Sequence, residues 1–152
     1  MPTKSSLSKS FRRDPLKNVP LGIFLIALSL TFVLNPDLPS NIIEYFKSFE
    51  TYNKFVQPPP EILLPVANFS IYLGIGLILL FVFRLVSKVA VWAAPENLSE
   101  GVFFVILNRL IIDFVEEGDN FIILVSLCLI VLGITITIGE LVGYAIRRYL
   151  RV

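Results

Sequence analysis

The feature that most constrains this chain is an apolar stretch from Phe121 to Tyr144, in which Glu140 is the one charged residue. A helix needs about 20 residues of this kind to cross the hydrocarbon core of a bilayer. Charged residues make up only 16% of the whole chain and hydrophobic residues 55%, whereas about a quarter of a soluble domain is charged. Together these features predict an integral membrane protein.

Similar apolar stretches recur along the chain and predict an all-α fold with four transmembrane helices. The expected spans are about residues 19–35, 62–84, 98–117 and 121–144, within a membrane domain over residues 19–147. The first span follows a basic tail, residues 1–18, and resembles the hydrophobic region of a signal peptide. Asn35, Pro36 and Asp37 follow it in place of a small-residue cleavage motif, so we expect this span to remain uncleaved.

Residues 41–56, between the first two spans, have a different pattern. Ile42, Ile43 and Phe46 recur at spacings near three and four, while Glu44 and Lys47 occupy other faces. This pattern predicts an amphipathic helix that is too short and too charged to cross the membrane. Such a helix is suited to the headgroup boundary, and packing on a partner subunit is the alternative.

The third segment, residues 98–117, differs from the other spans because Arg109 and Asp113 interrupt it. Each costs about 2.5 to 3.5 kcal/mol at a helix centre, while each large apolar residue returns about 0.3 to 0.6 kcal/mol. The segment is therefore marginal on its own. The two charges are four residues apart, so one partly neutralises the other. A helix on the membrane surface is the alternative.

The distribution of Lys and Arg decides between these alternatives, since cytoplasmic loops carry an excess of both. Four spans leave Lys47 and Lys54 outside and put ten basic residues inside, whereas three spans give eight inside and five outside. We therefore predict a multi-pass protein of the cell membrane with both termini in the cytoplasm. The inner residues are Lys4, Lys9, Arg12, Arg13, Lys17, Arg84, Lys88, Arg147, Arg148 and Arg151, the last two in a basic C-terminal end, residues 148–152.

A rise of 1.5 Å per residue places the polar residues of the spans at definite depths. Arg84 and Glu140 share a depth near the cytoplasmic face, and we predict that they form an ion pair. An intramembrane polar cluster is expected in the outer half of the bundle, made of Asn68, Ser70, Asn108, Arg109, Asp113 and Ser126.

The chain lacks the residues that several kinds of chemistry require. It contains no His and one Cys, Cys128, whereas haem, iron–sulfur, zinc and copper sites need such ligands, mostly in groups. No nucleophile and base pair and no phosphate-binding loop is evident. We therefore expect no enzyme activity, no catalytic residues, no cofactor and no metal site.

These observations favour a non-catalytic subunit or scaffold of a membrane complex or homo-oligomer. Four short helices leave little room for a substrate cavity, and Gly139-x-x-x-Gly143 is suited to close helix packing. The alternative is a homo-oligomeric ion channel or small transporter that uses Arg109, Asp113 and Glu140. The expected partners are the lipid bilayer and further membrane subunits. Nucleic acid is not expected, because 13 basic residues balance 12 acidic ones.

Overall fold

The computed structural model describes residues 14–52, 57–118 and 120–150. Within these ranges every regular element is helical, which confirms the all-α prediction. The helices are α1 (Val19–Leu34), α2 (Leu38–Tyr52), α3 (Pro60–Ser87), the short 3-10 helix η1 (Val91–Ala93), α4 (Ala94–Glu117) and α5 (Phe121–Leu150).

Prolines and one glycine set several of the helix boundaries. Helices α1, α3 and α4 each have a proline in their first turn, where the missing N–H costs no hydrogen bond. Gly118 ends α4 at a φ of 70° and donates its N–H to the carbonyl oxygen of Phe114. This left-handed conformation is readily adopted by glycine and is a common helix terminator.

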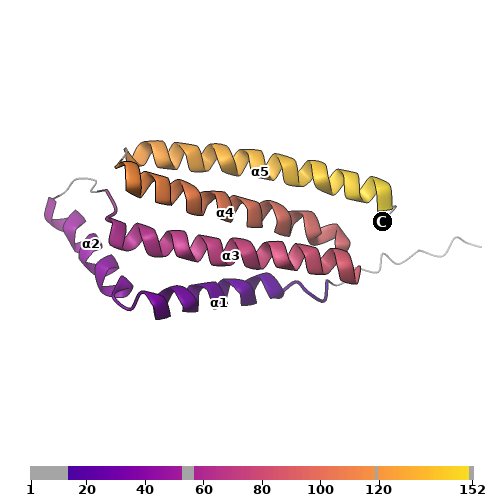
Figure 1. Ribbon diagram of the computed structural model, residues 1–152, viewed down its shortest axis with the longest axis horizontal. Helices are drawn as coiled ribbons and strands as arrows, with labels where there is room; N and C mark the ends of the chain where they lie inside the picture. Colours follow the sequence, from indigo (N-terminus) through magenta and orange to yellow (C-terminus); the bar gives the residue numbers. More distant parts are fainter. Residues whose placement is uncertain (1–13, 53–56, 119, 151–152) are drawn as a thin grey trace, which may run out of the picture.

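Four helices pack as an open row in one layer, in the order α1, α3, α4, α5 (Figure 1). Each helix runs antiparallel to its neighbours in the row, and the α3–α4 contact is the most extensive. We call the end where α3 and α5 finish the Arg84 end. The opposite end, where α4 finishes and α2 lies, is the Gly118 end.

Two apolar clusters hold the row together. At the Gly118 end, Leu63, Ala67, Ile111, Phe114 and Leu124 join α3, α4 and α5. A second cluster is centred on contacts between α1 and α3 and consists of Ala27, Leu73 and Leu77, with Phe104 of α4 against it. Between helices in a bilayer such contacts stabilise by close van der Waals packing, because lipid tails are as apolar as the side chains.

Glycines allow α4 to approach both of its neighbours closely. A Cβ atom on Gly74 of α3 would lie 2.9 Å from the carbonyl oxygen of Gly101 in α4, and the reverse distance is also 2.9 Å. Across the α4–α5 contact, a Cβ atom on Gly139 would lie 2.7 Å from Cβ of Ser99. Close packing predicted at Gly139 is thus confirmed, and it joins two helices of one chain.

By length and composition, two helices are suited to cross a membrane: α3, and α5 over Phe121–Ile146. Helices α1 and α2 pass the same test only as a pair, and the chain bends by 87° between them. Many large apolar side chains on α1 and α5 are exposed. The fold is therefore compatible with a membrane protein that has two or three spans by this test.

Candidate functional site

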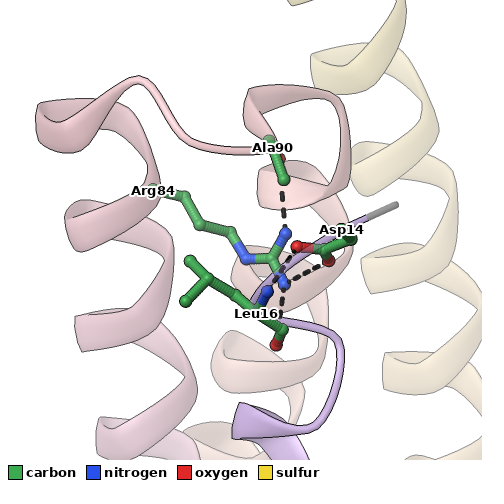
Figure 2. Close-up of polar contacts among 4 residues, drawn as sticks. All are labelled: Asp14, Leu16, Arg84 and Ala90. Carbon is green, nitrogen blue, oxygen red and sulfur yellow. Dashed lines mark hydrogen bonds and ion pairs between the residues drawn. The ribbon is translucent and has the colours of Figure 1, made fainter. Parts of the chain in front are cut away.

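Arg84 is the centre of a buried polar contact at the Arg84 end of the row (Figure 2). Its Nη2 lies 2.9 Å from Oδ2 of Asp14, and the two side chains are only 2% and 10% exposed. Nη1 donates to the carbonyl oxygen of Ala90 at 3.3 Å, and Nη2 also donates to that of Leu16 at 3.5 Å. The guanidinium thus ties the segment before α1 to the turn after α3.

The turn after α3 is shaped to bring a carbonyl group to this arginine. Lys88 and Ala90 have φ angles of 55° and 47°, in the left-handed region that is costly for residues with a Cβ atom. Together they reverse the chain between α3 and η1, and this places the Ala90 carbonyl against Arg84. The contact with the buried cation helps to offset the strain of the turn.

The predicted ion pair between Arg84 and Glu140 requires a correction, because the structure gives Arg84 a different partner. Asp14 occupies that place, while Glu140 lies on α5, beyond α4 in the row. Counting residues matched the two depths, but depth does not determine which helices are neighbours. Asp14 belongs to the predicted basic tail, and the sequence signal for its role is that it is the one acidic residue among residues 1–18.

Arg109 and Asp113 form another ion pair, one turn apart on α4. Their Nη2 and Oδ1 atoms are 2.6 Å apart, and the side chains are 68% and 38% exposed. The pair therefore points out of the row. Beside it, Nδ2 of Asn108 donates to the carbonyl oxygen of Ala67 at 2.9 Å, which joins α4 to α3.

The remaining residues of the expected polar cluster are separate from this pair. Ser70 is buried but donates to the carbonyl oxygen of Val66 in its own helix. Ser126 is exposed on α5 and donates to the carbonyl oxygen of Ile122, also in its own helix. Asn68 is half-buried on α3. Of the six residues, Arg109 and Asp113 are joined to each other by an ion pair, while Ser70, Asn108 and Ser126 donate to backbone carbonyl oxygens.

A groove of about 210 Å³ lies between the start of α4 and the end of α5. Its lining includes Trp92, Glu96, Ser99, Glu100 and Glu140. In the described residues, no group of three or more His, Cys, Asp or Glu is placed to hold a metal ion.

Comparison with known proteins adds nothing to this geometry, since no family model, curated protein or solved structure matches the chain. Function is therefore inferred from the row, from the Asp14–Arg84 and Arg109–Asp113 pairs and from the surfaces that the row leaves uncovered.

Proposed function

We propose that this protein is a four-span, non-catalytic subunit or scaffold of a membrane complex. The direction of the helices supports four spans. Helices α3 and α5 both begin at the Gly118 end and run the same way (Figure 1), so a chain that crosses the membrane in both must return between them. Helix α4 is the connecting segment and packs against both α3 and α5.

Helix α1 is suited to the remaining crossing, although it is short. Its 16 residues span about 24 Å at 1.5 Å per residue, against a hydrocarbon core of about 30 Å. Local thinning of the bilayer accommodates a short span at modest cost. Because the chain turns by 87° after α1, α2 then lies in the plane of the outer surface, with Ile43 and Phe46 exposed.

The excess of Lys and Arg orients the row with the Arg84 end in the cytoplasm. This places both termini there in a multi-pass protein of the cell membrane. Much of the predicted tail, residues 1–13, and the last two residues lie outside the described residues, as do residues 53–56 and Asp119.

The observation that carries the proposal is the exposed ion pair of Arg109 and Asp113. In a spanning α4, Arg109 lies about 13 Å below Gly118, where lipid would surround it on the open face of the row. Charged residues within a membrane are costly and almost always face protein or water. A second protein surface packed over this face would remove that cost, and the other subunits of a larger assembly would provide such a surface.

The alternative function is a homo-oligomeric channel or small transporter. The described helices form one layer and do not surround a pore, so several copies would have to build the pathway. The exposed Arg109–Asp113 pair favours this alternative only if it lines such a pathway, with Glu140 at the inner mouth. Arg109→Ala would then change ion flux in liposomes without abolishing assembly, and unchanged flux would contradict it.

Extraction from native membranes in a mild detergent, followed by native mass spectrometry, tests the subunit proposal. We expect the chain of 17.1 kDa to be recovered in a larger protein assembly. A monodisperse single chain, recovered also in lipid nanodiscs, would contradict the proposal.

Labelling of single cysteines in intact cells tests the four spans independently. Cysteines replace Ser10, Asp119 or Val152 in a Cys128→Ala background, and Leu79→Cys on the exposed face of α3 is the membrane-embedded control. We expect an impermeant reagent to label only position 119. Labelling of position 152 with protection of 119 would show that α4 does not cross.

A further inference from the structure

We propose that the open face of α4 is the centre of a two-fold interface with a second copy of this chain, in which the two Arg109–Asp113 pairs meet. The inference rests on the proposed crossing of α4, and it names the partner that covers the exposed pair.

One stripe of α4 defines this face. Its residues follow spacings of four and three, the pattern along which two helices pack side by side: Val102, Ile106, Arg109, Asp113 and Glu116. The flanks of the stripe are already occupied. On one side Gly101 and Asn108 contact α3, and on the other side Ser99 contacts Gly139 of α5. The stripe between them therefore faces out of the layer.

The charges on this stripe are complementary to themselves. The guanidinium of Arg109 extends to Asp113, so the positive and negative groups lie at the same depth despite their separation along the helix. A two-fold axis parallel to the helices brings the same depth of both copies together. Each guanidinium has five N–H donors and each carboxylate accepts several hydrogen bonds, so the four groups can alternate in charge around the axis.

The shape of the row supports the same partner. Stable folds pack elements in two or more layers, and this chain supplies one. Lipid is a suitable cover for the exposed apolar side chains but a costly one for the ion pair. Rotation about an axis in front of α4 reverses the order of the helices in the second row. Helix α5 of each copy then faces α3 of the other, and both α1 helices lie at the outer edges.

Cysteine cross-linking in lipid nanodiscs or native membranes tests this arrangement. Ile106→Cys, in the Cys128→Ala background, places the thiol one turn from Arg109 on the stripe. Leu25→Cys, at an exposed position of α1, is the matched control at the outer edge. We expect at least tenfold more cross-linked dimer from position 106 than from position 25. Equal cross-linking, or none at position 106, would overturn the proposal.

Charge exchange tests the role of the pair itself. R109D and D113R each place like charges at the axis, and we expect each to weaken dimerisation at least tenfold. The double variant R109D/D113R restores opposite charges and should recover the wild-type dissociation constant to within about threefold. Arg148→Asp, an exposed change near the end of α5, should have no effect. Circular dichroism identifies any variant that fails to fold, and the double variant keeps the test decisive.

Other results separate this inference from the proposed function. A wild-type chain that is monomeric but still purifies with different subunits would overturn the dimer and leave the subunit role intact. A dimer that forms only with anionic lipid, and is not restored by charge exchange, would show that Arg109 binds a lipid phosphate and would overturn the inference. Protection of position 119 would contradict the four-span subunit and the dimer together.

Discussion

Two Arg–Asp pairs among the described residues have opposite settings. Asp14 and Arg84 lie far apart in the sequence and meet in a contact that is almost fully buried. Arg109 and Asp113 lie one helical turn apart, and most of the guanidinium side chain is exposed. The first pair holds two segments of one chain together, whereas the second adds little to the fold of the single chain and leaves donors and acceptors available to another surface.

Position in the sequence is a poor guide to the burial of these two arginines. Arg84 is near the end of an apolar stretch, where a long side chain normally reaches water, yet it is the most deeply buried cation described. Arg109 is in the middle of an apolar stretch, where burial is expected, yet it points out of the row. Arg84 is buried because the segment before α1 packs over it, and Arg109 is exposed because no described segment of the chain covers it.

The largest effect is expected from Asp14→Ala. This change removes the carboxylate from a buried guanidinium that cannot lose its proton, and removal of one partner from a buried pair costs about 3 to 5 kcal/mol. The free energy of unfolding can be measured in detergent through the fluorescence of Trp92, the single tryptophan, two residues after Ala90. The double variant Asp14→Ala/Arg84→Met, which leaves no buried charge, should be more stable than the single one. Equal stability of the two would show that the charge is not what matters.

The next largest effect is expected from Gly101→Val, which tests whether the glycine contact or the exposed pair positions α4. The added Cβ would lie 2.9 Å from the carbonyl oxygen of Gly74, and overpacking of this kind costs about 1 to 3 kcal/mol. Gly133→Ala is the control, because nothing lies within 4 Å of its Cβ position and alanine favours a helix by about 0.8 to 1 kcal/mol. A Gly101→Val protein as stable as this control would mean that α3 and α4 separate easily.

A smaller effect on the single chain is expected from Arg109→Ala. An exposed pair one turn apart on a helix contributes only about 0.3 to 0.5 kcal/mol, so unfolding of the monomer in detergent should change by no more than this. A loss as large as that for Asp14→Ala would abolish the distinction between the two pairs.

Local patterns made much of the fold predictable. The apolar stretches located α1, α3 and α5, and prolines marked the starts of α1 and α3. The spacing of Ile42, Ile43 and Phe46 located α2, although α5 continues to Leu150, beyond the predicted 144. Lateral neighbours were not predictable, because an apolar helix surface packs against another helix or against lipid without a change in sequence pattern. The row order, and with it the partner of Arg84, depends on contacts such as Gly74 with Gly101 that no local rule specifies.

The buried pair also has a consequence for the chain as a mechanical object. By joining Asp14 to Arg84, it closes a ring of polypeptide that contains α1, α2 and α3. Helix α2 lies at the far side of this ring, and both ends of the ring are fastened at one point. A force that pulls α2 away from the rest of the chain therefore loads the Asp14–Arg84 contact through both α1 and α3, and the ring opens only if that contact breaks.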